Sequence, residues 1–219
     1  MEQPDSRPKR AVIIAGGGIT TSIQIAQGDY VIAADSGYDI ARNQEIRVDL
    51  LVGDLDSITA QGLQHAEASG VVIERFPEAK DKTDFELALE AAIAVGAHAV
   101  DIYGGEAGSF GHLLGISTGL TARTWARIDL RWFVGSDTVF PVHPKRPLEV
   151  SPPVGTRLTL VPIGDAQNVT ATGVQWPLSR EPLPRGTSRG LSNITTDPIC
   201  TVSLTDGALL VIVDEGDPI

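Results

Sequence analysis

The chain has a single cysteine, Cys200, in 219 residues, so no disulfide can form within it. This scarcity of cysteine fits a reducing compartment. Cys200 lies in the apolar run 199–202, and a free cysteine in such a run is expected to be a buried packing residue.

The sequence also lacks a long apolar run. No stretch approaches the ~18 apolar residues that a membrane-spanning helix needs. Residues 1–18 carry proline and charge ahead of a short apolar run that soon meets glycine, unlike the apolar segment of a secretory signal. We therefore expect a cytoplasmic protein with no membrane partner.

The chain also has fewer basic than acidic residues. Lysine and arginine number 17 against 28 acidic residues, which gives a net charge of −11. Nucleic-acid-binding proteins normally present a basic face, so that class is disfavoured and we expect no nucleic-acid partner. ATP remains compatible with this charge, because metal ions can bridge carboxylates to phosphates.

Short apolar runs alternate with helix-like segments in the first half of the chain. The apolar runs cover residues 11–15, 30–34, 50–52, 71–73 and 99–103, and the helix-like segments cover 20–27, 38–44, 59–69 and 83–95. The last helix has the clearest signals, since Thr83 and Glu86 have capping-box spacing and Gly96 follows. The alternation predicts an α/β/α domain with a mostly parallel sheet over residues 11–126.

From about residue 128 the pattern changes to strands and Pro/Gly turns with little helix. Residues 201–204 and 208–213 flank Thr205-Asp206-Gly207, a composition typical of a hairpin turn. We predict a smaller all-β sandwich domain over residues 130–217.

Polar clusters follow the predicted strands of the first domain. In an open α/β sheet, ligands bind beyond the carboxyl ends of the strands, so these clusters are expected to converge. Asp54 and Asp56 flank one residue, and an extended backbone would point both carboxylates the same way. Oxygen ligands suit Mg²⁺, which makes this pair a candidate metal site. The alternative is a simple turn followed by a helix cap.

Other candidates have both a functional and a structural interpretation. Asp81 and Asp84 lie at the start of the predicted 83–95 helix, where acidic residues favour the helix dipole in any case. Lys80 and Lys82 would neutralise phosphate charge or lie in solvent. His112 ends a glycine-rich loop and would bind phosphate, cap a helix or pack.

The second predicted domain adds a compact polar loop and an aromatic residue. The loop, residues 186–193, combines small hydroxyls, an amide and two glycines, and is a binding loop or an ordinary turn. Trp176 would offer a flat face to an aromatic cation, or be partly buried in the sandwich.

Together these motifs resemble the thiamine pyrophosphokinase family from about residue 11 onward. The resemblance lies in ADSGYD (34–39), DLLVGDLDSI (49–58), FPEAKDKTD (76–84), the glycine-rich loop ending in His112, GVQWPL (173–178) and GTSRGLSN (186–193). It implies a catalytic α/β domain that binds ATP and Mg²⁺, a β-sandwich domain, and a homodimer that binds thiamine between its subunits. The implied reaction moves a diphosphate from ATP to the hydroxyl group of thiamine and releases AMP.

The resemblance also implies site residues. The catalytic candidates are Asp54, Asp56, Asp81 and Asp84. The first three of these, Asp54, Asp56 and Asp81, are the candidate Mg²⁺ ligands. The nucleotide-side candidates are Asp35, Ser36, Gly37, Lys82, Thr83, Gly108 and His112. The thiamine-side candidates are Trp176, Ser188, Ser192 and Asn193.

One motif departs from the family pattern. The family usually has Gly-Gly-Arg-x-Asp-His with an Asn four residues later, whereas this chain has Ser109, Gly111 and Ile116 at the Arg, Asp and Asn positions. Loss of a phosphate-binding Arg removes charge-assisted hydrogen bonds, for which Lys80, Lys82 and Arg123 are candidate replacements. Two alternatives therefore stay open: a related enzyme with a different alcohol substrate, and a thiamine- or nucleotide-binding protein with impaired catalysis.

Overall fold

The structure is a computed structural model that describes residues 10–216. The chain divides into two compact units. The first runs to Leu113 and includes Ile128–Leu130, and the second comprises Leu114–Arg127 and the chain from Arg131 onward. The division into domains at 11–126 and 130–217 stays a prediction, and residue 217 lies outside the described residues.

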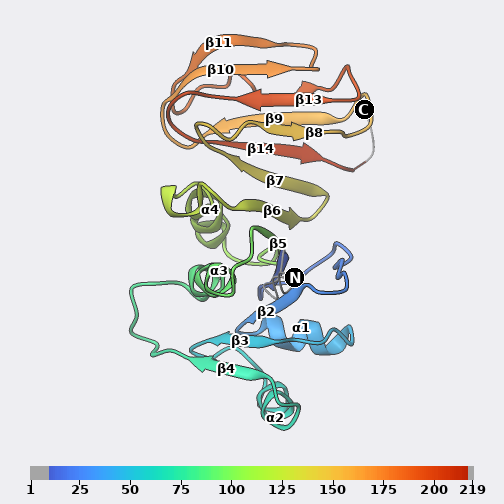
Figure 1. Cartoon of the computed structure of the whole chain (residues 1–219), viewed down its shortest axis with the longest axis vertical. Coiled ribbons are helices and arrows are strands. Elements are labelled where there is room, and N and C mark those ends of the chain that lie inside the picture. The colour runs from blue at the N-terminus through green and yellow to red at the C-terminus, as the bar shows by residue number, and fades with distance from the viewer. Residues whose placement is uncertain (1–9, 217–219) are drawn as a thin grey trace, which may run out of the picture. The chain divides into compact units, whose positions relative to one another are not determined.

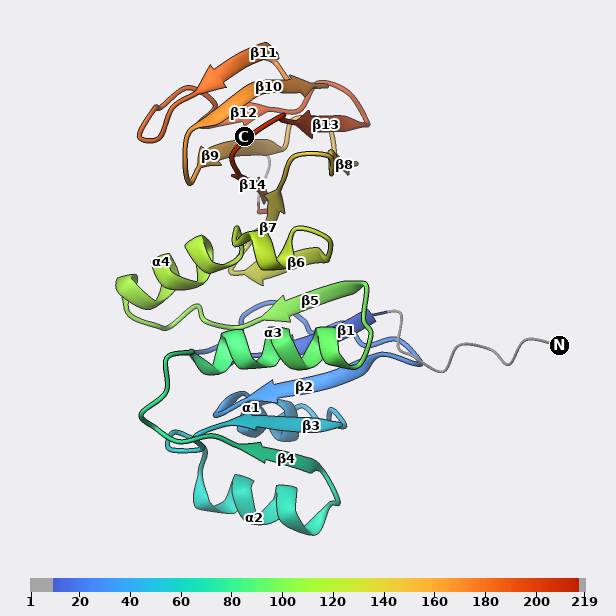
Figure 2. The ribbon, with the colours of Figure 1, turned by 60° about the vertical axis from the view of Figure 1, so that its left-hand side comes forward.

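The sheet of the first unit is built from five parallel strands, as the sequence predicts. Across the sheet the order is β5 (Ala99–Tyr103), β1 (Arg10–Ile14), β2 (Tyr30–Ala34), β3 (Leu50–Gly53) and β4 (Val72–Arg75). Every neighbouring pair is parallel, so the carboxyl ends of the strands share one edge, toward which the arrowheads in Figure 2 point. The near-complete burial of β1, β2 and β3 explains their continuous apolar runs.

Three helices lie within residues 10–109 of the first unit: α1 (Gly37–Asn43), α2 (Ala60–Ala68) and α3 (Asp84–Ala94). Of these, α1 and α3 pack on the sheet and α2 contacts α1. Figure 1 shows α3 on one face of the parallel strands and α1 on the other. The hydroxyl of Thr83 accepts a hydrogen bond from the backbone N–H of Glu86 at 3.2 Å, which confirms the predicted cap.

The predicted helix over residues 20–27 does not form, and this segment is a loop. Side chains bind its backbone N–H groups in place of a helical ladder. Thr20 N donates to Glu106 Oε1 at 3.1 Å, and Gln24 N donates to the Tyr103 hydroxyl at 3.3 Å. Such side-chain partners compete with helix formation, and they come from distant parts of the sequence.

Two antiparallel sheets form the core of the second unit, which confirms the predicted β-sandwich. The first sheet has the order β12 (Asn193–Ile194), β9 (Arg157–Pro162), β14 (Leu209–Asp214), β7 (Asp137–Val142) and β6 (Asp129–Val134). The second has the order β11 (Leu178–Leu183), β10 (Ala166–Thr172), β13 (Cys200–Ser203) and β8 (Leu148–Val150). Cys200 is fully buried in this core, as expected.

The predicted hairpin between residues 201–204 and 208–213 is wrong. The two strands belong to different sheets, since β13 pairs with β10 and β8 while β14 pairs with β7 and β9. The turn still needs its glycine: Gly207 has φ +89°, and a Cβ there would lie 2.3 Å from Asp165 O. The turn signal was therefore real, but it connects two sheets rather than two paired strands.

The remaining elements are helix α4 (Phe110–Gly119) and the short 3-10 helix η1 (Arg123–Trp125). Within residues 10–216, no helix combines the length and the apolar character needed to cross a membrane.

Candidate active site

A cavity of about 540 Å³ lies at the carboxyl edge of the parallel sheet. The sequence-predicted residues that line it are Asp35, Ser36, Asp54, Asp56, Lys82, Thr83, Asp84, Gly108 and His112. They come from the ends of β2 and β3, the start of α3, the loop before α4 and the first turn of α4. Strand direction therefore gathers segments that are distant in the sequence, as the sequence analysis expects.

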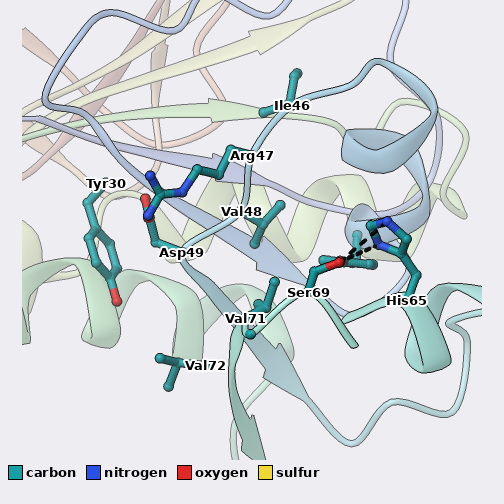
Figure 3. A pocket seen from close by; sticks show the side chains of 11 residues that line it. Tyr30, Ile46, Arg47, Val48, Asp49, His65, Ser69, Val71 and Val72 are labelled. Carbon is teal, nitrogen blue, oxygen red and sulfur yellow. Dashed lines mark hydrogen bonds and ion pairs between the residues drawn. The ribbon is translucent and has the colours of Figure 1, made fainter. Parts of the chain in front are cut away.

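A second cavity of about 400 Å³ lies at the opposite edge, where β2, β3 and β4 begin (Figure 3). Its lining contains one carboxylate, Asp49, which lies 3.4 Å from Arg47 and accepts a hydrogen bond from Val31 N. The acidic residues that the sequence singles out line the first cavity instead.

Three aspartates meet in the first cavity. Asp35, Asp54 and Asp84 each offer one carboxylate oxygen, and these atoms all lie within 4.8 Å of one another. Gly53 makes this approach possible, because a Cβ there would lie 3.1 Å from Asp84 Oδ1 and 3.3 Å from the Cβ of Asp35. Its φ of +147° is also strained for any other residue.

Buried oxygens in this cluster lack hydrogen-bond donors. Asp35 is 9% exposed, and its Oδ1 accepts no hydrogen bond from any described residue. Burial raises the pKa of Asp35, hydrogen bonds from Ser36 and Ser57 oppose this, and the charges of Asp84 and Asp56 add to the increase. A buried acceptor without a donor is costly, so the site favours a bound proton or cation.

Lys80 provides a positive charge inside the cluster. Its Nζ lies 2.5 Å from Asp54 Oδ2 and 3.0 Å from Asp84 Oδ1. The second contact is an ion pair. Apart from it, Asp84 Oδ1 is a buried oxygen without a hydrogen-bond donor among the described residues. The hydrogen bond from Lys80 lowers the pKa of Asp54.

The donor set fits a hard divalent cation. Three carboxylates supply oxygen ligands, and within residues 10–216 two of their buried oxygens have no hydrogen-bond donor. Asp56 lines the cavity but is exposed and lies outside the close cluster, and Asp81 is exposed and does not line the cavity. Metal binding by Asp56 or Asp81 stays a prediction.

The backbone around Asp54 differs from the extended form assumed in the sequence analysis. Leu55 has φ +66°, so the chain turns between Asp54 and Asp56. Asp35, at the end of β2, also has a positive φ of 49°. Left-handed conformations cost a bulky residue about 1 kcal/mol or more, and they persist where the surrounding packing enforces them.

The glycine-rich loop before α4 completes the cavity wall. Gly108, Ser109 and His112 line the cavity, and the Ser109 hydroxyl accepts a hydrogen bond from His112 N at 3.3 Å. At Gly111, the nearest atom to an added Cβ is Ser109 Oγ at 3.9 Å, so a side chain would fit there. Ile116, the third departure from the family pattern, is buried.

One nucleotide-side candidate has a clear packing function. A Cβ on Gly37 would lie 1.9 Å from Ile14 O, so Gly37 lets α1 approach β1. Gly37 is not among the residues that line the cavity.

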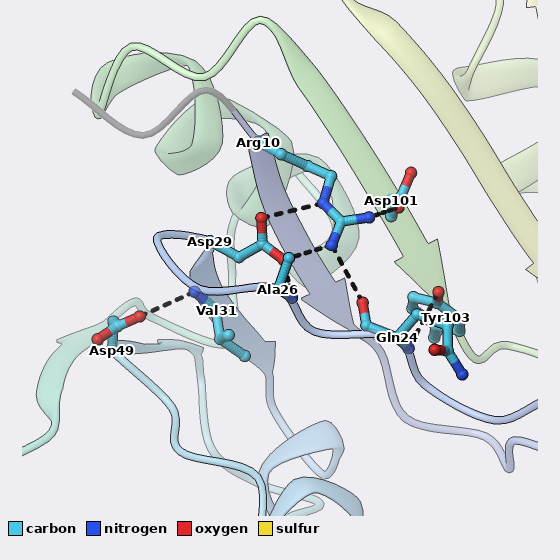
Figure 4. A network of polar contacts seen from close by, with 8 residues as sticks. All are labelled: Arg10, Gln24, Ala26, Asp29, Val31, Asp49, Asp101 and Tyr103. Carbon is cyan, nitrogen blue, oxygen red and sulfur yellow. Dashed lines mark hydrogen bonds and ion pairs between the residues drawn. The ribbon is translucent and has the colours of Figure 1, made fainter. Parts of the chain in front are cut away.

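An ionic network that the sequence analysis missed anchors the loop between β1 and β2. Arg10 donates to Asp101 at 2.6 Å, to both carboxylate oxygens of Asp29, and to Gln24 O (Figure 4). Asp101 is 1% exposed. The anchored loop begins with Gly16 and Gly17, which line the cavity. Scattered single charges gave no sequence signal for this network.

In the second unit, Asn193 joins the two candidate thiamine-side segments. Its Oδ1 accepts from Trp176 N at 3.0 Å, and its Nδ2 donates to Trp176 O at 2.8 Å. Asn193 is buried, so this amide holds the Trp176 backbone in place, while half of the Trp176 surface is exposed. Ser188 and Ser192 are exposed. Asn193 positions the Trp176 backbone. Contact with thiamine by Trp176, Ser188, Ser192 and Asn193 stays a prediction.

The fold and the acidic cavity define an α/β enzyme with a carboxylate-lined cavity at the strand ends and a β-sandwich unit. The family follows from sequence comparison. Residues 23–128 match the model of the thiamin pyrophosphokinase catalytic domain, and residues 145–209 match that of the thiamin pyrophosphokinase vitamin B1 binding domain. The chain belongs to the thiamine pyrophosphokinase family.

Individual relatives agree with this assignment. Thiamine pyrophosphokinase from Bacillus subtilis (strain 168) is 26% identical over 162 residues, which cover 73% of this chain and 75% of the relative. The crystal structure of thiamine pyrophosphokinase from Bacillus subtilis matches with a TM-score of 0.81 at 22% identity, covering 94% of this chain and all of that chain. A thiamin pyrophosphokinase family protein from Enterococcus faecalis matches with a TM-score of 0.82 at 22% identity, covering 95% and 100%.

Proposed function

We propose that this protein transfers a diphosphate from Mg²⁺-bound ATP to the hydroxyl group of thiamine, forming thiamine diphosphate and AMP. The observation that carries the proposal is the meeting of Asp35, Asp54 and Asp84 at the carboxyl edge of the sheet, with buried oxygens that lack donors. Both domain matches and the Bacillus relative support the substrate assignment.

The residues of the first unit bind and orient the nucleotide. Catalysis of phosphoryl transfer is mainly positioning and neutralisation of charge. Asp35, Asp54 and Asp84 hold the metal, which supplies charge neutralisation when bound. Gly108 and His112 line the phosphate side of the cavity, and a carboxylate of the cavity wall accepts the proton of the substrate hydroxyl.

The second unit supplies the thiamine side. Trp176 presents an exposed indole face, which suits the positively charged thiazolium ring of thiamine. The hydroxyls of Ser188 and Ser192 are available for the neutral parts of the molecule.

The protein acts as a homodimer in this proposal, in the cytoplasm. Helix α4 supports the dimer, because Phe110 is 80% exposed and Leu114 is 50% exposed on it. Large exposed apolar side chains on one helix are typical of a protein contact.

The test is release of AMP from ATP with and without thiamine. We expect AMP formation to depend on thiamine, and Asp54→Asn to lower it by about 10²-fold or more, since the cavity loses a metal-binding charge. Glu67→Gln on the exposed face of α2 is the matched control and should keep its activity.

Three results would contradict the proposal in different ways. Full activity in Asp54→Asn would reject the metal assignment. Binding of both ligands without AMP formation would identify a binding protein, which is the alternative that Ser109 and Gly111 favour. AMP formation with another alcohol but not with thiamine would identify a related enzyme.

A further inference from the structure

We propose that Lys80 is an exchangeable cation: without ligands its ammonium holds the carboxylates together, and when metal and nucleotide bind it turns to the phosphates. This inference rests on the proposed function, because it needs a metal–nucleotide complex in the cavity. Lys80 would thereby supply the positive charge that the family pattern places at position 109, where this chain has Ser109.

The first step concerns charge in the ligand-free cavity. Three carboxylates within 4.8 Å of one another repel strongly, and one would otherwise tend to stay protonated. The Lys80 Nζ contacts two of them, at 2.5 Å from Asp54 and 3.0 Å from Asp84. Its side chain is only 13% exposed, so this charge is held inside the cavity rather than in solvent.

The second step is that Lys80 and a metal ion compete for the same oxygens. Carboxylate oxygens bind Mg²⁺ at about 2.1 Å, so a metal bound to the oxygens that Lys80 contacts would lie within about 5 Å of the ammonium. Two cations at that distance repel. We therefore expect Lys80 to give up at least one carboxylate when the metal enters.

The third step identifies where the ammonium goes. Lys80 lies in the loop before α3, and its flexible four-carbon stem lets the ammonium move within the cavity. The bound nucleotide brings negative phosphates to the same place. The other lysine in the cavity lining, Lys82, is paired with Glu90 at 2.6 Å and is 45% exposed, which leaves Lys80 as the better-placed partner for a phosphate.

If this exchange occurs, replacing Lys80 should change the affinity for Mn²⁺ alone and the affinity for the Mn²⁺–nucleotide complex in opposite directions. Binding of Mn²⁺ alone is measured from the electron paramagnetic resonance signal of the free ion. Binding of the preformed Mn²⁺ complex of α,β-methylene-ATP, in which the bond that the reaction would break is blocked, is measured by isothermal titration calorimetry. In Lys80→Met, Mn²⁺ alone should bind about tenfold more tightly, because its competitor is gone. The Mn²⁺–analogue complex should bind about tenfold more weakly, because a charge-assisted bond is lost.

Matched variants separate this effect from a general loss of charge or fold. Arg47→Met removes one positive charge at the opposite edge of the sheet, and both constants should stay within about twofold. Lys80→Arg keeps the charge and should stay near wild type in both titrations. Lys80→Gln repeats the measurement if Lys80→Met does not fold.

Each other outcome overturns the inference. Weaker binding in both titrations would make Lys80 a structural residue. Tighter or unchanged binding in both would show that it does not serve the nucleotide. Thiamine-dependent AMP release is measured separately. If Lys80→Met shows the opposite changes in the two binding constants while the wild type forms no AMP, the proposed reaction is rejected and the role of Lys80 is kept.

Discussion

The clearest test of the carboxylate cluster is Asp35→Asn. Asp35 is 9% exposed and its Oδ1 has no hydrogen-bond donor among the described residues. An unsatisfied buried group costs about 1–3 kcal/mol, and more when it is charged. Asparagine has nearly the same shape without the charge, so the ligand-free variant should be about 1–2 kcal/mol more stable than the wild type at neutral pH.

The ligand-bound protein should behave in the opposite way. At a ligand concentration of 100 times Kd, binding stabilises the folded state by about 2.7 kcal/mol. If the variant binds the metal–nucleotide complex about a hundredfold more weakly, the same concentration adds only about 0.4 kcal/mol. The variant should thus be the more stable protein without ligand and gain far less when ligand is added.

The pH dependence has a definite sign. Burial raises the pKa of Asp35 above its ordinary value of 3.8, so at mildly acidic pH the folded protein keeps a proton that the unfolded chain has lost. This contribution to stability is fully present below the ordinary pKa and is lost as pH rises through the raised pKa. The wild type should therefore lose this contribution above pH 4, and Asp35→Asn should not.

Thermal unfolding with and without MgATP measures these effects. For a chain of this size, 1 kcal/mol corresponds to about 2–4 °C in Tm. Glu67→Gln, which removes an exposed acid, should change stability by less than about 0.5 kcal/mol. A lower Tm for ligand-free Asp35→Asn, or an undiminished rise with MgATP, would refute the reasoning.

Three further predictions test other parts of the molecule. Ser109→Arg combined with Gly111→Asp restores the family residues, and a side chain has room at position 111. The double variant should lower the apparent KM for ATP about tenfold in the AMP assay, whereas an unchanged KM would show that another group already binds the phosphates. Asn193→Ala removes the buried amide and should cost about 2–3 kcal/mol in urea unfolding, with a loss under 0.5 kcal/mol contradicting its positioning role. Arg10→Met leaves the buried Asp101 without this ion pair and should cost about 3 kcal/mol by the same measurement, whereas a neutral effect would mean that the network adds nothing.

The sequence alone predicted the parallel sheet, the β-sandwich and the edge at which the site lies. These features depend on local patterns: continuous apolar runs, a capping threonine before α3, and polar residues directly after strands. Since parallel strands end at one edge, the order of the elements is sufficient to bring the clusters together. The absence of regular backbone hydrogen bonding in residues 20–27 could not be predicted, because the partners Glu106 and Tyr103 lie far away in the sequence.

Which carboxylates meet was decided only by the tertiary structure. Spacing in the sequence selected Asp54 and Asp56, and the family resemblance added Asp81, whereas folding brings Asp35 and Asp84 to Asp54. Side-chain direction beyond a strand end depends on one or two backbone angles, such as the positive φ of Asp35, and packing fixes those angles. Short-range patterns determine the edge of the sheet, but only the packed backbone determines which oxygens share a cation.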